Sequence, residues 1–251
     1  MWKLLVIVGA VALLHFTLAK YPSPFKKSAD PKREILEALG LWAALVVATT
    51  VALFVVPEEQ ITSPTVGGGL VVNVLLSPFW VFIPLYVVLR LNKWSWTELG
   101  FATPRSWLVT IFALLLFGYS GLHPLFTDPG REPLSAGLIV LALYQPAFTE
   151  ELLFRGIIQG KFERAVGQGS ALIYTALLFG LGHTVVNFFG PQWYAHGQSV
   201  GNALGLLVIQ TLAGLIFGLI YMKSRSIFPS MAAHFLTDWR LGSIVKLLTG
   251  A

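Results

Sequence analysis

Cysteine is absent from the 251 residues of this chain, which excludes disulfide bonds, a thiol nucleophile and thiolate metal ligands. Charge is also scarce. Charged residues make up 12% and hydrophobic residues 55% of the sequence, and the mean hydropathy is +0.73. Soluble domains carry about 25% charged residues. The composition therefore excludes an ordinary soluble domain. It predicts an integral membrane protein, with the membrane lipid bilayer as its partner.

The chain also lacks a concentrated run or stripe of basic residues, although it has 17 lysines and arginines and a net charge of +5. Its basic residues are scattered over short segments between apolar runs. Proteins that bind nucleic acids instead gather basic residues on one face. The sequence therefore predicts no nucleic-acid partner. The positive charges are instead expected to set the orientation of the spans of a multi-pass protein in the cell membrane.

Apolar runs of membrane-spanning length recur along the whole chain. They predict an all-α, polytopic membrane protein with about eight transmembrane helices, folded as a single integral membrane domain over residues 1–251. The first run is interpreted as an uncleaved helix, because cleavage would leave the five basic residues that follow it on the translocated side. The predicted spans are Trp2–Leu18, Ile35–Val56, Val71–Leu91, Trp107–Leu122, Ser135–Phe154, Ser170–Phe189, Ala203–Met222 and Ser230–Leu248.

The basic residues also predict the orientation of these spans. Thirteen of the 17 fall in the segments after the first, third, fifth and seventh spans or, in the case of Arg90, at the end of the third span. Because cytoplasmic segments of membrane proteins are rich in Lys and Arg, these four segments are predicted to be cytoplasmic. Both chain termini are then predicted to lie on the opposite side.

Two adjacent carboxylates and an arginine interrupt the fifth apolar run, in the sequence Glu150-Glu151-Leu-Leu-Phe-Arg155. Ionisable groups inside an apolar span are functional-site hypotheses by default. On a helix, Glu151 and Arg155 are four residues apart with the acid nearer the N-terminus, which favours an ion pair. Glu150 is rotated about 100° away. The spacing predicts a structural Glu151–Arg155 pair and leaves Glu150 for chemistry, toward the cytoplasmic end of the span.

Two further spans carry polar residues that apolar packing does not explain. The sixth contains His183, with Asn187 one turn further along the same face, and the eighth contains His234 and Asp238 at the same spacing. Burying each polar group alone costs free energy, and a shared wet cavity lowers that cost for all of them. The three clusters are therefore predicted to meet in an active site within the helix bundle.

The predicted depths of His183 and His234 in the membrane do not agree with a shared site. If the sixth and eighth spans begin on the same side at Ser170 and Ser230, a rise of 1.5 Å per residue puts His183 about 20 Å and His234 about 6 Å deep. Helix tilt, or a different start for one span, has to bring the two imidazoles to one level.

Glutamate, histidine and aspartate without cysteine are compatible with two kinds of hydrolytic site. A carboxylate and an imidazole can remove a proton from water while other donors hold the oxyanion of a peptide carbonyl. The same side chains are competent metal ligands. However, the chain has no H-E-x-x-H pattern, and Glu150, His183 and His234 are 33 and 51 residues apart. The residues alone leave both kinds of site open.

At these residues the sequence resembles the CAAX prenyl protease and bacteriocin-processing (CPBP) family of intramembrane glutamic endopeptidases, which includes the Ras-converting CAAX protease type. The family pattern is E-E-x-x-x-R, then F-x-x-x-H, then H-x-x-x-N or H-x-x-x-D on separate helices. All three occur in order, beginning at Glu150, Phe179 and His234. The resemblance covers residues 135–248, which are predicted to form the catalytic core.

The resemblance implies an endopeptidase that cleaves membrane-associated peptides or lipidated proteins with no metal and no cofactor. It implies that Glu150 and His183 activate water, that His234 and Asp238 form the oxyanion site, and that Glu151 and Arg155 support them. Asp238 replaces the commoner asparagine, and an ionised carboxylate cannot donate to an oxyanion. Asp238 is therefore expected to be protonated or to orient His234, with Asn187 as an alternative donor.

Two other classes of protein also bury such residues. A non-catalytic membrane immunity or scaffold protein could use the same polar cavity for binding. A proton-coupled transporter could use glutamate and histidine as a relay, but the chain has no two-fold hydropathy symmetry of the kind that transporters show. An endopeptidase is the preferred hypothesis.

Overall fold

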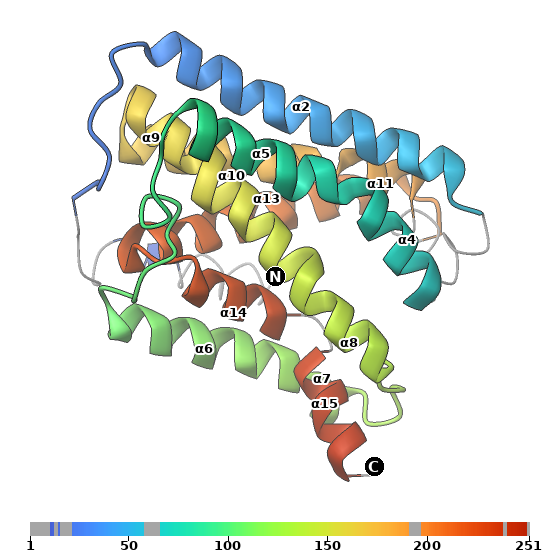
Figure 1. Cartoon of the computed structure of the whole chain (residues 1–251). Helices are drawn as coiled ribbons and strands as arrows, with labels where there is room; N and C mark the ends of the chain where they lie inside the picture. The colour runs from blue at the N-terminus through green and yellow to red at the C-terminus, as the bar shows by residue number, and fades with distance from the viewer. Residues whose placement is uncertain are drawn as a thin grey trace.

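A computed structural model of the chain describes residues 11, 12, 15, 22–57, 66–190, 197–237 and 240–249. These residues form helices and loops, with no strand among them (Figure 1). The predicted all-α fold is confirmed. The helices, with π-helical segments labelled η, are α2 (Pro31–Val55), α4 (Val66–Ser77), η2 (Pro78–Phe82), α5 (Ile83–Leu85), η3 (Tyr86–Leu91), α6 (Trp107–Leu122), α7 (Pro124–Thr127), α8 (Ala136–Ala142), η4 (Leu143–Phe148), η5 (Glu151–Gln159), α9 (Gly160–Val166), α10 (Gln168–Gly182), α11 (Thr184–Phe189), α13 (Val200–Ser224), α14 (Phe228–Leu236) and α15 (Arg240–Thr249).

Six helical stretches of the described residues are long and apolar enough to cross a membrane. They correspond to the second through seventh predicted spans, so a multi-pass membrane protein is confirmed and a count of eight is not. The first predicted span, Trp2–Leu18, lies almost wholly outside the described residues. The six stretches are Pro31–Val55, Leu70–Leu91, Trp107–Thr127, Ala136–Val166, Gln168–Phe189 and Val200–Ser224.

The predicted eighth span, Ser230–Leu248, is wrong as a single helix. The structure divides it into α14 and α15, because the backbone at Thr237 turns extended (φ −64°, ψ 172°). Arg240 donates a 2.8 Å hydrogen bond to the carbonyl of His234. That bond satisfies a last-turn carbonyl of α14 which a continuing helix would otherwise bond. Apolar composition did not reveal the break.

The fifth predicted span ended at Phe154, whereas the helical stretch continues from Ala136 to Val166. The prediction stopped where charges begin. In the structure those charges stay buried, because distant parts of the chain pair with them: Lys161 meets Glu34 at 3.1 Å, and Glu163 meets Arg225 at 2.9 Å. Paired charges can remain inside a fold that would exclude isolated ones.

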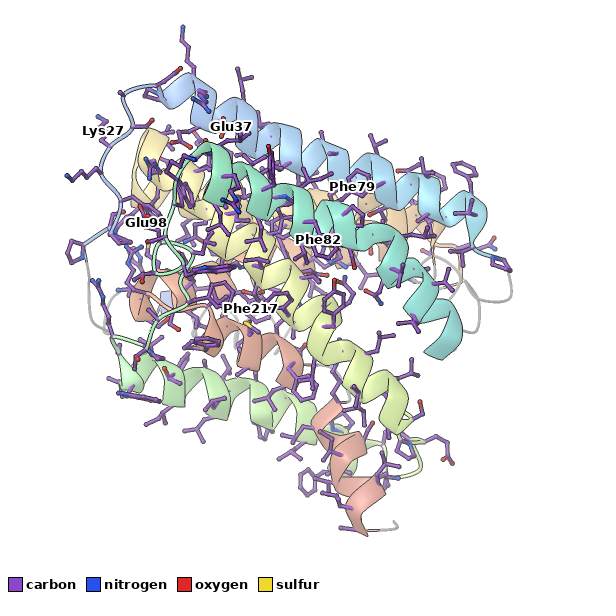
Figure 2. The ribbon with its side chains drawn as sticks, viewed as in Figure 1. Lys27, Glu37, Phe79, Phe82, Glu98 and Phe217 are labelled. Carbon is purple, nitrogen blue, oxygen red and sulfur yellow. The ribbon has the colours of Figure 1, made fainter. Side chains whose placement is uncertain are left out.

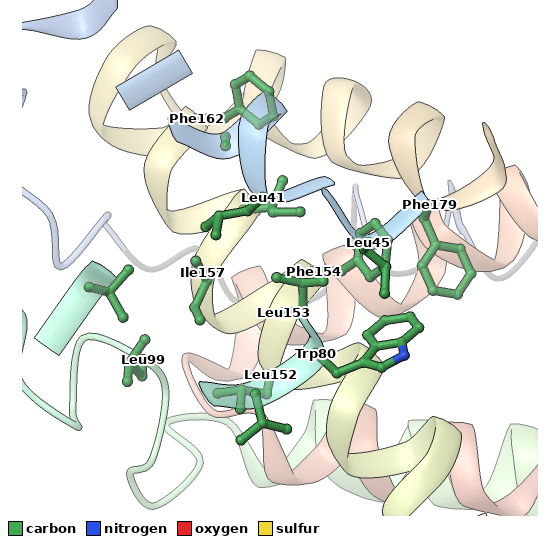
Figure 3. Close-up of a cluster of buried hydrophobic side chains, with 14 of the residues drawn as sticks. Leu41, Leu45, Trp80, Leu99, Leu152, Leu153, Phe154, Ile157, Phe162 and Phe179 are labelled. Carbon is green, nitrogen blue, oxygen red and sulfur yellow. The ribbon is translucent and has the colours of Figure 1, made fainter. Parts of the chain in front are cut away.

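The stretch from Ala136 to Val166 forms the centre of the bundle (Figure 1). Every residue of η5 is buried. Figure 3 shows Leu153 and Phe154 of η5 among Leu41 and Leu45 of α2 and Trp80 of η2, all in one hydrophobic cluster. A helix that is buried on all sides suits the core of a larger bundle. The functional side chains of η5 therefore project from a rigid central element.

Two glycines of α13 allow other segments to approach closely. A Cβ atom at Gly214 would lie 3.0 Å from the side chain of Phe179, and one at Gly218 would lie 2.7 Å from Leu172. The carbonyl groups of these glycines also accept hydrogen bonds from Arg155 and Gln159. Small residues thus bring α10 and η5 against the backbone of α13.

One end of the bundle, here called the basic end, is formed by residues 22–34, 92–106, 161–167 and 223–227. Direct contacts join these segments: Arg164 accepts from the amide of Ser28 and Ser224 from that of Arg105, and the Arg164 side chain lies 3.6 Å from Glu98. Figure 2 shows Lys27 and Glu98 at this end and Phe217 deeper in the bundle. The segments that the charge pattern placed on one side of the membrane therefore lie together.

We expect the basic end to face the cytoplasm, because it collects the Lys- and Arg-rich segments. Reporter domains fused after Ser28, Gly167 and Ser224 should read as cytoplasmic, and fusions after Gly130 and Gly250 as external. The measurement is alkaline phosphatase activity against green fluorescence for each fusion. A cytoplasmic signal from the Gly250 fusion would contradict the predicted orientation.

Candidate active site

Glu150 is buried near the middle of the central helical stretch, 14 residues after Ala136 and 16 before Val166. The sequence had placed it toward one end of its span, which is wrong because the helix continues past Phe154. Its carboxylate atom Oε2 lies 4.0 Å from Nε2 of His183 and 3.8 Å from Nε2 of His234. Both distances exceed a direct hydrogen bond. Oε2 has no hydrogen-bond partner among the residues that the structure describes.

His183 lies where α10 ends and α11 begins. Its Nδ1 is 2.7 Å from the carbonyl oxygen of Phe179. A carbonyl oxygen only accepts, so Nδ1 carries the hydrogen, and in the neutral imidazole Nε2 carries the lone pair. The hydrogen bond to its own helix therefore presents a basic nitrogen to Glu150.

His234 projects from α14 and is held on two sides. Its Nδ1 lies 2.9 Å from Oε1 of Glu151, and its ring stacks on Phe217 with 4.7 Å between centroids and 21° between planes. An ionised carboxylate only accepts hydrogen bonds, so Nδ1 donates and Nε2 faces Glu150. The two adjacent glutamates therefore contact the same imidazole from different sides.

The predicted Glu151–Arg155 ion pair is present, with Nε and Oε2 3.3 Å apart and both side chains fully buried. The guanidinium also lies 4.4 Å from the centre of the Phe179 ring and 5.3 Å from that of Phe217, in the range of cation–π contacts. Its Nη2 donates to the carbonyl of Gly214 at 3.3 Å. Arg155 therefore has its charge compensated by Glu151 and by the faces of two aromatic rings.

The expected difference in depth between the two histidines disappears because the chain at the basic end folds inward, toward η5, before α14 begins. The amide of Ile227, just before α14, donates to the carbonyl of Gly100, and the neighbouring Leu99 carbonyl packs on Gly156 of η5. The start of α14 is thus already level with the middle of η5. His234 reaches Glu150 after less than two helical turns.

Asn187 does not join this cluster. Its amide nitrogen donates to Oε1 of Gln210 at 2.6 Å, and its oxygen accepts from Nε2 of Gln210 at 3.2 Å. That reciprocal pair joins α11 to α13. The structure therefore gives Asn187 a partner in the bundle, and its expected role as an oxyanion donor stays a prediction. Asp238 lies outside the described residues, and its proposed role stays a prediction.

The cluster consists of one carboxylate flanked by two imidazoles, each oriented by a separate acceptor. Such groups can exchange protons with a small molecule held between them. Among the described residues, no group of three His, Asp or Glu side chains has the arrangement of a metal site.

Sequence reasoning missed Gln145 and Phe217. Gln145 donates to Glu150, and Phe217 stacks on His234. A glutamine inside an apolar run, five residues before Glu150, was a signal that could have been used. Phe217 gave no signal, because an aromatic residue in an apolar helix is ordinary.

Residues 132–240 match the family model described as type II CAAX prenyl endopeptidase Rce1-like. No curated protein and no solved structure matches the chain. The matched segment contains Glu150, His183 and His234. Over residues 132–240 the chain is therefore similar to the Rce1-like type II CAAX prenyl endopeptidases of the CPBP family.

Proposed function

We propose that the protein is an intramembrane glutamic endopeptidase that hydrolyses peptide bonds with water activated by Glu150 and His183. The observation that carries the proposal is the position of the buried Glu150 carboxylate, whose Oε2 faces the Nε2 atoms of both histidines at 4.0 and 3.8 Å. The family match to a protease supports it. A non-catalytic immunity or scaffold role is not favoured by that match.

Water activation follows from the hydrogen-bond capacities of these groups. Glu150 Oε2 and His183 Nε2 are both acceptors, so a water molecule between them would donate to each. Its oxygen then attacks the scissile carbonyl carbon while Glu150 takes a proton. Glu150 returns that proton to the amide nitrogen as the C–N bond breaks, which balances the hydrolysis.

His234 is proposed to stabilise the oxyanion that forms on the carbonyl. With Nδ1 bound to Glu151, a protonated Nε2 of His234 points toward the reacting centre as a donor. A preorganised donor in a site without bulk water contributes strongly to catalysis. Asp238, four residues later in the sequence, is proposed to assist His234, and Glu151 and Arg155 support the histidine.

The proposed substrate is a prenylated CAAX peptide, from the description of the matched family, cleaved within the cell membrane. Hydrolysis is proposed to need no metal ion, since carboxylate and imidazole supply both the base and the oxyanion donor. The whole chain is proposed to act as a single membrane domain with residues 135–248 as its core.

The proposal is tested by reconstituting the protein in liposomes with a fluorogenic prenylated peptide. Wild-type protein should cleave it, retain activity after prolonged treatment with a strong chelator, and lose activity on Glu150→Ala. The same peptide without its prenyl group is the matched substrate control. Activity that disappears with chelator and returns with Zn²⁺ would contradict the metal-independent mechanism, and equal cleavage by Glu150→Ala would contradict the site.

A further inference from the structure

Gln145 interrupts the central helical stretch one turn before Glu150. Its backbone is extended (φ −119°, ψ 119°) between helical neighbours. Its side chain turns toward the site, where Nε2 donates to Oε1 of Glu150 at 3.2 Å. The two residues are five apart, so a regular helix would not bring them together. The break in the helix makes this contact.

A second hydrogen bond holds the other end of the Gln145 amide. The hydroxyl of Thr149, which is fully buried, donates to Oε1 of Gln145. The reversed amide would put an oxygen against the Glu150 carboxylate oxygen, where neither atom can donate. The carboxylate therefore selects the orientation with Nε2 toward Glu150, and the Thr149 hydroxyl holds the amide there.

The two oxygens of the Glu150 carboxylate consequently have different surroundings. Oε1 is bound by Gln145, while Oε2 faces the two imidazoles and has no hydrogen-bond partner within the described ranges of the chain. A partial rotation of the carboxylate would break the bond to Gln145 and turn the other oxygen away from the imidazoles. Of the side-chain hydrogen bonds between described residues, the one from Gln145 is the one that reaches Glu150.

We infer that Gln145 is a positioning residue for Glu150, with Thr149 fixing its amide. This inference rests on the proposed hydrolytic function, because it assigns Glu150 the base. Gln145 does not act on the substrate itself. It keeps the basic oxygen of Glu150 aligned with His183 and His234, and misalignment of such groups can cost about 10²-fold in rate.

The test is the steady-state cleavage of a prenylated peptide by Gln145→Leu in liposomes. We expect kcat to fall by about 10²-fold with KM nearly unchanged, since binding groups are untouched. Gln145→Glu, which has the same shape but no amide donor, should show a similar loss. Gln145→Leu with wild-type kcat would overturn the inference.

Gln159→Leu is the matched control. Gln159 is another buried glutamine of the same helical stretch, and its Nε2 donates to the carbonyl of Gly218 at 3.2 Å, away from Glu150. Its substitution should lower thermal stability while leaving kcat of the folded protein unchanged. If Gln159→Leu lowers kcat as much as Gln145→Leu does, the effect is general destabilisation and the inference is wrong.

Thr149 provides a second test that does not depend on folding of the Gln145 variants. Thr149→Val should lower kcat roughly tenfold, the equivalent of one hydrogen bond, and Thr149→Ser should restore it. Adding Thr149→Val to Gln145→Leu should cause no further loss. Independent, multiplying losses would contradict a role of Thr149 through Gln145.

Different results would contradict the proposed function and the role inferred for Gln145. If wild-type protein does not cleave the peptide, or Glu150→Ala cleaves it as well as wild type, the proposed function is wrong and the inference is lost with it. If Glu150→Ala is inactive while both Gln145→Leu and Thr149→Val keep wild-type kcat, the inference alone is overturned.

Discussion

Substitution of Glu150 by glutamine is expected to lower kcat by about 10²–10⁴-fold, the range for loss of a general base. The amide has nearly the same shape, and Oε2 of Glu150 makes no hydrogen bond to the part of the chain that the structure describes. Folding should therefore be preserved. The measurement is kcat in liposomes together with the thermal unfolding midpoint in detergent.

Glu150→Asp is the matched variant, because it keeps the carboxylate but retracts it by one methylene from the histidines. It should retain more activity than Glu150→Gln if charge and basicity matter. Wild-type kcat in Glu150→Gln would exclude Glu150 as the base, and an unfolded Glu150→Gln protein would show that the residue is needed for the fold.

Glu151→Gln is expected to have the largest effect on stability, about 3–5 kcal/mol, since it leaves Arg155 as an uncompensated buried charge. Both side chains of the pair are fully buried. Glu151 also accepts from Nδ1 of His234, so the folded fraction should lose activity as well. The measurement is the free energy of unfolding in denaturant, with kcat normalised to folded protein.

The control for Glu151→Gln removes both charges at once. Glu151→Gln combined with Arg155→Met should be more stable than Glu151→Gln alone, because a buried pair replaced by uncharged groups costs less than a broken pair. It should not recover activity, since His234 still lacks its carboxylate. Additive destabilisation by the two substitutions would show that the 3.3 Å contact does not couple them.

The three polar motifs could be predicted from the sequence because ionisable side chains are scarce in apolar runs. Glu150, His183 and His234 come from three helical segments, and the cost of burying them separately was the argument for one cluster. The structure places the Nε2 atoms of both histidines within 4.0 Å of Oε2 of Glu150. Their geometry needed the fold, because the start of α14 depends on a contact between Ile227 and Gly100.

Helix ends were less predictable, because the sequence ends a span where charged residues appear, whereas the structure buries some of those charges against distant partners. The sequence ended the fifth span at Phe154, but Lys161 finds Glu34 at a separation of 127 residues. Such a partner cannot be identified from local sequence. The division of the eighth span likewise depends on Arg240 reaching back to the carbonyl of His234.

The contact between Gln145 and Glu150 was outside the reach of helical spacing rules. Those rules pair residues three or four apart, whereas Gln145 is five residues away and is not helical. The equivalent rule for Glu151 and Arg155 succeeded because η5 keeps them on one side. Local patterns therefore predicted the regular part of the site and missed the part that a break in the helix creates.

The central claim is that Glu150 and His183 act together on one water molecule. It is tested most directly by the kcat values of Glu150→Gln, His183→Gln and the double variant on the same prenylated peptide. Residues that act as a unit have strongly non-additive effects. We expect the double variant to be no slower than the slower single variant. A double variant whose loss equals the product of the two single losses would show that the residues act independently and would contradict the mechanism.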